Sequence, residues 1–419
     1  MTKIYCAKYL VPGNAPPIIG GALLAVNGKI VSIGRFADLR RAHPEVQVVE
    51  FPDCVLLPLL VNAHTHLELT DFPLWAQQFG ETTEPDNFVD WILRLVRVKR
   101  KLGKKAYSCS VANGIRQSLA AGTGAVGDIL SQYSSRKVYQ GTMLHGVLYL
   151  ESLGHDPEII SRFRNELRSL LAEERVGLMQ LGISPHSPYT ISADYLKDVY
   201  EKCFRQNLPC STHLAESPEE IEFVVHGGGD LAKRFYPSVG WKYLIPKGSG
   251  CRPAEYLHRH AGLFPKNLLV HGVQLSGREI ELLAKQQMSL VLCPRSNAKL
   301  KVGKAPVAQL LQAGINLSLG TDSMASNDSL SVWDEIAFAH NWFGGECDAP
   351  TLLKMATSGG ADALGLAAQL GSLEVGKLAE FQVLQPETAV AENEIFDYLV
   401  APGRTEEIVQ VFHQGETSV

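Results

Sequence analysis

The segment VLLPLLVNAHTH, residues 55–66, decides the fold. Its apolar run Val55–Val61 predicts a buried strand, and the pair His64 and His66 follows at the end of that strand. Side chains of a strand alternate between two faces, so two histidines one residue apart point to the same side and can chelate one metal ion. A His-x-His pair alone is weak evidence, because such pairs also occur by chance on surfaces. The segment predicts a strand that ends at a metal site, and other segments must supply the remaining ligands.

Apolar runs of strand length recur through the middle of the chain, with helical stretches such as 88–100 and 194–205 between them. Strands that alternate with helices predict parallel βα units, and eight such units form an α/β fold, a distorted (β/α)8 TIM-type barrel. The active site of such a barrel lies at the carboxyl ends of its strands. The eight expected strand ends are Asn62–His64, Val126–Asp128, Leu148–Glu151, Ile183–His186, Thr212–His213, Val270–His271, Leu292–Pro294 and Leu319–Asp322.

The two ends of the chain predict a small β domain. Four strand-like runs occur there, and the first two are joined by Asn27-Gly28, which is a strong hairpin signal. The runs are residues 20–26, 29–33, 380–384 and 407–412. We expect both ends to form one small β-sandwich domain, residues 1–58 and 366–419, with the barrel, residues 59–365, inserted between them.

Composition excludes several classes of protein. The 419 residues are 45% hydrophobic and 20% charged, as in an ordinary globular chain. The formal net charge of −5 argues against a nucleic-acid binder, which carries a basic face. The sequence has neither a signal-peptide core nor an uncharged apolar run of about 18 residues, so no membrane partner is expected. The eight cysteines form no Cys-x-x-Cys pair, which favours a reduced, cytoplasmic protein.

Three further residues with suitable chemistry follow apolar runs, namely His213, His271 and Asp322. If the eight-strand interpretation holds, each projects into the same barrel mouth as the first histidine pair. A lone buried histidine is more often a satisfied core residue, and this interpretation is preferred for His145 and His340. The number of candidates at strand ends makes a metal site the better hypothesis here.

The order His-x-His, His, His, Asp on successive strands resembles the amidohydrolase superfamily over almost the whole chain. The segments Thr212–Glu216, Cys293–Asn297 and Gly320–Ser323 are similar to its mononuclear deaminase and chlorohydrolase branch. Binuclear relatives carry a bridging lysine or glutamate at the end of strand four. Here that strand ends in Ser-Pro-His at residues 184–186, which favours one metal. The chain departs from the pattern at Leu59, where relatives often have glycine, and we expect this to concern packing only.

By this resemblance the metal ligands would be His64, His66, His213 and Asp322. Three neutral imidazoles and one carboxylate suit a single Zn²⁺ ion, and Fe²⁺ fits the same ligands. Such a metal lowers the pKa of a water molecule, so that hydroxide is available near neutral pH.

The resemblance also implies acid–base roles. His271 would hold the attacking water and help to move its proton, and Asp322 would accept a proton. Glu216 would protonate the ring nitrogen beside the attacked carbon and later deliver a proton to the leaving amine. A charge in the first turn of a helix is the alternative for Glu216. Asp128 is expected to be a structural hydrogen-bond partner.

Three residues are candidates for contact with the substrate. By the same resemblance, Glu84 would hold ribose hydroxyls, His186 would contact the substrate, and Arg295 would meet a substrate carboxylate. The alternatives are a solvated loop carboxylate for Glu84, a capping or packing role for His186, and a loop-bracing arginine for Arg295. Ser296 and Asn297 are expected to shape the loop after strand seven rather than to perform chemistry.

The implied activity is hydrolytic deamination of an adenosine-type 6-aminopurine nucleoside, because the overall resemblance is to aminodeoxyfutalosine deaminases of menaquinone biosynthesis. Deaminases of S-adenosylhomocysteine or methylthioadenosine are close alternatives, and guanine deaminase, cytosine deaminase and triazine chlorohydrolases are further ones. Hydrolysis of an amide or cyclic amide is disfavoured by Glu216 and by the missing bridging residue. A non-catalytic barrel scaffold is the alternative from another class, but such chains typically lose metal ligands, and the expected ligands are present here.

The remaining expectations concern assembly and one loop. The expected partner is a small, purine nucleoside-like substrate, and the chain could form a homodimer. The stretch Tyr236–Cys251 is rich in glycine, proline and aromatic residues and predicts a long loop. The loop is either a substrate lid or a plain surface insertion, and the sequence does not distinguish the two.

Overall fold

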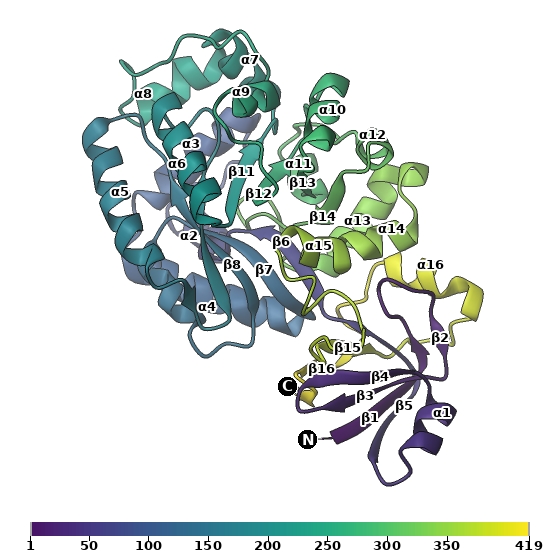
Figure 1. The fold of residues 1–419 in the computed structure, drawn as a ribbon. Helices are drawn as coiled ribbons and strands as arrows, with labels where there is room; N and C mark the ends of the chain where they lie inside the picture. The colour runs from purple at the N-terminus through teal and green to yellow at the C-terminus, as the bar shows by residue number, and fades with distance from the viewer. Residues whose placement is uncertain (1, 418–419) are drawn as a thin grey trace.

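The computed structural model describes residues 2–417 and has two parts, a barrel surrounded by helices and a smaller sheet beside it (Figure 1). Eight parallel strands build the barrel in the spatial order β14-β13-β12-β11-β10-β8-β7-β6, with the short β9 (Arg175–Val176) attached to β10. Each predicted strand end falls at one of them, so the barrel prediction is confirmed. Their bounds are β6 (Leu60–Thr65), β7 (Thr123–Leu130), β8 (His145–Ser152), β10 (Met179–Pro185), β11 (Cys210–Leu214), β12 (Asn267–His271), β13 (Ser289–Leu292) and β14 (Asn316–Leu319).

The barrel is nearly closed, and the closing contact lies beside the first histidine pair. One parallel bridge joins Thr65, the last residue of β6, to Asp322, just beyond β14. The backbone N–H of Asp322 donates to the carbonyl oxygen of His64 at 3.1 Å, and Thr65 Oγ1 donates to the carbonyl oxygen of Asp322 at 3.0 Å. The two ends of the sheet therefore meet at the predicted metal site.

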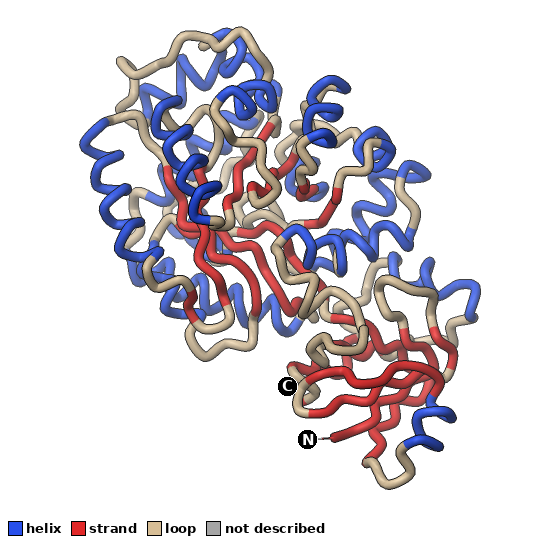
Figure 2. Tube along the Cα trace, in the orientation of Figure 1, coloured by secondary structure: helices blue, strands red, loops and turns tan. Residues whose placement is uncertain are grey.

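Helices cover the outer face of the barrel (Figure 2). The predicted helices at 88–100 and 194–205 are present as α3 and α6. Among residues 2–417, each helix is too short or too polar to cross a bilayer. The helices are α1 (Phe36–Ala42), α2 (Phe72–Gln78), α3 (Phe88–Lys99), α4 (Lys104–Ala120), α5 (Pro157–Leu171), α6 (Ala193–Gln206), α7 (Pro218–His226), α8 (Tyr236–Ser238), α9 (Pro253–Arg259), α10 (Gly277–Lys285), α11 (Pro294–Lys299), α12 (Val307–Gln312), α13 (Val332–Phe343), α14 (Ala349–Met355), α15 (Ser358–Ala363) and α16 (Ile395–Val400), with short 3₁₀ or π turns at Leu67–Leu69, Tyr133–Tyr139, Leu231–Phe235, Gly344–Glu346 and Glu392–Glu394.

Both chain ends contribute to the smaller sheet, as the sequence predicts, and the purple and yellow strands lie together in Figure 1. Asn27 and Gly28 form the expected hairpin turn between β3 and β4, where Asn27 takes a φ of 49° and Gly28 a φ of 79°. The strands of the expected sandwich are joined edge to edge in one mixed sheet. They are β1 (Thr2–Leu10), β2 (Ile18–Ile19), β3 (Gly21–Val26), β4 (Lys29–Arg35), β5 (Gln47–Pro58), β15 (Phe381–Leu384), β16 (Ile408–His413) and β17 (Glu416–Thr417).

The C-terminal segment also contacts the barrel. Ile395 and Leu399 of α16 are buried in one cluster with Trp333 of α13 and Leu352 of α14. The division of the chain at residue 366 stays a prediction, because residues beyond it contribute to both parts.

The barrel strands alternate between two apolar clusters. In β12, Leu268 and Val270 belong to the cluster inside the barrel, and Leu269 belongs to the cluster between strands and helices. Strict alternation would point the next side chain, His271, away from the barrel axis. The φ of +74° at His271 ends the extended backbone, and its side chain lines the central cavity. A positive φ is unfavourable for a residue other than glycine, so the surrounding structure must hold this conformation.

Candidate metal centre and cavity

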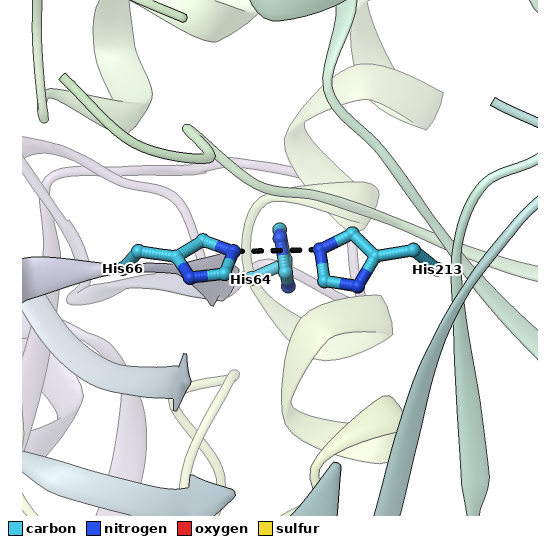
Figure 3. A group of neighbouring side chains, drawn as sticks. All are labelled: His64, His66 and His213. Carbon is cyan, nitrogen blue, oxygen red and sulfur yellow. Dashed lines mark hydrogen bonds between the residues drawn. The ribbon is translucent and has the colours of Figure 1, made fainter. Parts of the chain in front are cut away.

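Three histidines from two strands meet at the barrel mouth. His64 lies in β6, His66 directly follows β6, and His213 lies in β11 (Figure 3). All three are buried, and their ligand nitrogens lie within 4.8 Å of one another, with 3.4 Å between Nε2 of His66 and Nε2 of His213. Nε2 of His64 is buried and has no hydrogen-bond partner among residues 2–417. A buried nitrogen without a partner, facing two other imidazoles, fits a metal ligand.

The electrostatic environment keeps the imidazoles of His66 and His213 neutral. Burial and the neighbouring His64 lower the pKa of His66 to about 3, and burial and the surrounding histidines hold the pKa of His213 well below its ordinary value. Nδ1 of His213 bonds the carbonyl oxygen of His186 at 2.8 Å, so this nitrogen carries the hydrogen and Nε2 keeps its lone pair. Neutral imidazole is the form that binds metals.

Asp322, which lies just beyond β14 and is bridged to the end of β6, completes the group. Its Oδ1 lies 3.5 Å from Nε2 of His64 and 3.5 Å from Nε2 of His66. Its Oδ2 accepts hydrogen bonds from Ser296 Oγ at 2.7 Å and Ser326 Oγ at 2.6 Å, which leaves Oδ1 directed at the histidines. Burial alone would raise the pKa of Asp322, but the facing histidines hold it well below its ordinary value. The carboxylate is therefore ionised and available as a fourth ligand.

An acidic side chain and a fourth histidine face each other beside this group. Oε1 of Glu216 lies 3.6 Å from Nε2 of His271, and Nδ1 of His271 bonds Asn297 Oδ1 at 2.9 Å. The buried Glu220 carboxylate accepts the backbone N–H of Glu216 at 2.8 Å and so fixes the loop after β11. Burial, and then the charge of Asp322, raise the pKa of Glu216 well above its ordinary value. Burial lowers the pKa of His271 to about 4, so a neutral imidazole faces a carboxyl group whose pKa is raised.

These residues line a cavity of about 440 Å³. Its other lining residues are mainly apolar and include Leu95, Val96, Phe235 and Trp241. A pocket of this size with a few convergent polar groups is typical of a small-molecule site. The cavity therefore offers both polar and apolar surface to a ligand.

Residues 55–417 match the model of a family described as the amidohydrolase family. The chain belongs to the amidohydrolase family. The match includes every residue of the site described above.

Two curated amidohydrolase relatives cover most of the chain. It is 30% identical to a 5-methylthioadenosine/S-adenosylhomocysteine deaminase of Syntrophobacter fumaroxidans, over 93% of this chain and 85% of the relative. It is also 30% identical to an aminodeoxyfutalosine deaminase of Deinococcus radiodurans, over 82% of this chain and 81% of the relative. A crystal structure of an adenosine deaminase from Xanthomonas campestris with bound zinc is 25% identical, has a TM-score of 0.76, and matches over 100% of this chain and 92% of that one.

The structure brings one of the three expected substrate contacts of this amidohydrolase into the cavity. His186 lines the cavity, and its Nδ1 bonds Glu151 Oε1 at 2.8 Å. Glu84 is exposed and lines a separate, smaller pocket. Arg295 donates to Asn327 Oδ1 at 3.0 Å and pairs with Asp328, so its guanidinium braces the loop instead of lining the cavity.

Two residues expected to shape a loop contact the site directly. Ser296 bonds Asp322, and Asn297 bonds His271. The expectation for them was incomplete, because the turn after β13 becomes the helix α11 and aims both side chains at neighbouring strand ends. Asp128 has the structural role that was expected, since it accepts the backbone N–H of Leu67 at 2.7 Å.

Sequence reasoning missed other residues of the cavity wall, chiefly Lys99, Glu151 and Trp241. The position of Glu151 at the end of a predicted barrel strand was a usable signal. Lys99 belongs to a basic stretch that resembles a solvated helix face, and it gave no such signal. The stretch 236–251 begins as α8 and continues without regular structure, and its Trp241 reaches the cavity wall. Closure of this loop as a lid stays a prediction.

Proposed function

We propose that this amidohydrolase-family deaminase acts on an adenosine-type 6-aminopurine nucleoside, with aminodeoxyfutalosine as its substrate. The observation that carries the proposal is the buried Glu216, whose carboxylate lies 3.6 Å from Nε2 of His271, beside the three histidines of the metal centre. The 30% identity to the aminodeoxyfutalosine deaminase of Deinococcus radiodurans supports the choice of substrate.

The residues present fit one divalent metal ion. The metal would be held by His64, His66, His213 and Asp322. Three imidazoles with one carboxylate suit Zn²⁺, and the adenosine deaminase structure from Xanthomonas campestris contains bound zinc. Fe²⁺ takes the same ligands. When bound, the metal would lower the pKa of a water molecule, so that hydroxide is available near neutral pH.

The protein's own groups would move the protons. Nδ1 of His271 donates to Asn297, so its Nε2 lone pair can accept a proton from the attacking water. Glu216, whose pKa is raised by burial and by the charge of Asp322, would donate a proton to the ring nitrogen next to the attacked carbon. The water oxygen bonds to the carbon, and the carbon–nitrogen bond to the amino group breaks. One water proton passes through these side chains to the departing ammonia, and the other replaces the proton that Glu216 gave to the ring nitrogen. The ring keeps a carbonyl oxygen where the amine was.

The walls of the cavity suit a nucleoside with a large substituent. The apolar half offers Leu95, Val96 and Trp241 to such a group, and Lys99 and Arg100 supply cations for a substrate carboxylate. A methylthioadenosine or S-adenosylhomocysteine deaminase is the second candidate, because the relative from Syntrophobacter fumaroxidans matches over 93% of the chain at equal identity.

A substrate panel tests the proposal. The zinc-loaded protein, with metal content verified, is incubated with aminodeoxyfutalosine, 5′-methylthioadenosine, S-adenosylhomocysteine, adenosine and guanine. The ultraviolet change from adenine to hypoxanthine reports turnover. We expect aminodeoxyfutalosine to show the highest kcat/KM. A higher value for a thioether nucleoside would move the assignment to the second candidate, and no turnover of any 6-aminopurine nucleoside would contradict the proposal.

A further inference from the structure

Glu151, the penultimate residue of β8, is a carboxylate on the cavity wall to which no role has yet been given. It is 8% exposed, and its Oε1 accepts a hydrogen bond from Nδ1 of His186 at 2.8 Å. No hydrogen bond from residues 2–417 reaches its Oε2. One oxygen of this carboxylate therefore remains for a ligand in the cavity.

The charge state of Glu151 limits what that ligand can offer. Burial would raise the pKa of Glu151, but His186 and Lys99 lower it to about 2. An ionised carboxylate only accepts hydrogen bonds, and such bonds are stronger than those between neutral groups. The ligand group that faces Oε2 must be a donor. Lys99 does not fill this role, because its Nζ donates to Glu68 Oε1 at 3.2 Å and to Ser131 Oγ at 2.9 Å.

The position of Glu151 indicates which part of a nucleoside it faces. Three carboxylates line the cavity, and two of them, Glu216 and Asp322, lie at the end where the purine amino group would react. Glu151 bonds His186, whose ring packs on that of His213 with 4.4 Å between centroids, and neither Glu216 nor Asp322 bonds His186. A purine bound with its amino carbon near the three histidines extends away from them toward its sugar. The carboxylate that remains is therefore available to the sugar and not to the reacting carbon.

We propose that Glu151 binds the ribose hydroxyls of the substrate and selects ribosides over 2′,3′-dideoxyribosides. This inference rests on the proposed deaminase activity and adds its sugar specificity. It gives Glu151 the role that the sequence suggested for Glu84, which is exposed and lines another pocket. The hydrogen bond from His186 holds the Glu151 carboxylate in place before the substrate arrives.

The test compares two substrates in two proteins. The kcat/KM of the zinc-loaded native protein is measured for the fastest riboside of the panel and for its 2′,3′-dideoxy counterpart, and both measurements are repeated with Glu151→Gln. In the native protein we expect the riboside to be preferred by about 10- to 100-fold, as for a hydrogen bond to a charged group. In Glu151→Gln the riboside should lose most of that advantage, while the dideoxy substrate changes by less than about threefold.

Each other outcome overturns the inference. Equal native rates for the two substrates would show that the hydroxyls are not bound, whether or not the variant folds. An equal loss on both substrates in Glu151→Gln would show that Glu151 only orients His186. The same measurements on Glu84→Gln test the rival assignment, and a hydroxyl-dependent loss there would move the role to Glu84. Activity on both substrates without discrimination leaves the deaminase standing, whereas no turnover of any riboside removes the deaminase and this inference together.

Discussion

Replacing Glu216 by glutamine should abolish most of the proposed activity without disturbing the site. Glutamine has the same shape but has no acidic proton to give to the ring nitrogen. The loop after β11 should keep its conformation, because Glu220 binds the backbone N–H of Glu216 at 2.8 Å and not its side chain. Glu216→Gln therefore isolates the proton-transfer role of the side chain.

The expected size of the loss follows from the surroundings of Glu216. A positioned general acid–base contributes about 10²- to 10⁴-fold, or about 3–5 kcal/mol of barrier. Asp322 is occupied by Ser296 and Ser326 and faces the histidines, so it is poorly placed to replace Glu216. We expect kcat to fall by about 10³-fold, with KM changed by less than about threefold, because the lost interaction acts mainly in the transition state.

The assay follows the conversion of adenine to hypoxanthine by ultraviolet absorption, with the metal content of native and variant proteins measured in parallel. Glu219→Gln, which changes a neighbouring carboxylate that does not line the cavity, is the matched control and should keep native kinetics. A Glu216→Gln protein with full metal content and a rate within tenfold of native would refute the assignment of Glu216 as the proton donor.

Three other predictions concern the metal, one buried acid and the cavity wall. Chelation should abolish turnover and lower Tm, and added Zn²⁺ should restore both, because a ligand that binds only the folded state stabilises it; calorimetry of the chelated and reloaded protein checks this. Burial raises the folded-state pKa of Asp128 to about 8, well above its unfolded value, so native stability should fall as pH rises from about 4 to 8, by at most about 1.4 kcal/mol per pH unit. Asp128→Asn should remove this dependence of the unfolding free energy on pH. Urea denaturation at several pH values measures the dependence, and an equal dependence in both proteins would contradict the prediction. Trp241→Ala should raise KM for nucleosides with large substituents by about tenfold and that for adenosine less, since Trp241 lines the apolar half of the cavity.

Local patterns predicted most of the fold. Each of the eight strand ends follows a short, mostly apolar run, and a strand's character depends mainly on such neighbours in sequence. Asn27-Gly28 predicted its hairpin because few other residue pairs adopt two consecutive left-handed conformations. The grouping of His64, His66 and His213 followed from the barrel, which places the carboxyl ends of its strands around one mouth.

Side chains that reach the cavity by less direct routes were not predictable. Ser296 and Asn297 looked like loop residues, but α11 aims them at Asp322 and His271. Arg295 has the charge to bind a substrate carboxylate, but in the folded protein its guanidinium is already bound by Asn327 and Asp328. Which partner such a side chain finds depends on segments about 30 residues away in the chain.

The sequence by itself determined the barrel, the small sheet from both ends and the histidine group, because periodicity and strand-end position are properties of neighbouring residues. Only the tertiary structure decided the shape and chemistry of the cavity beyond the metal centre. It turned His271 inward through a positive φ, left Glu84 outside, and brought Glu151 and Trp241 to the wall. A cavity is formed where distant segments approach, and the distance between segments is set by packing of the whole molecule and not by any one of them.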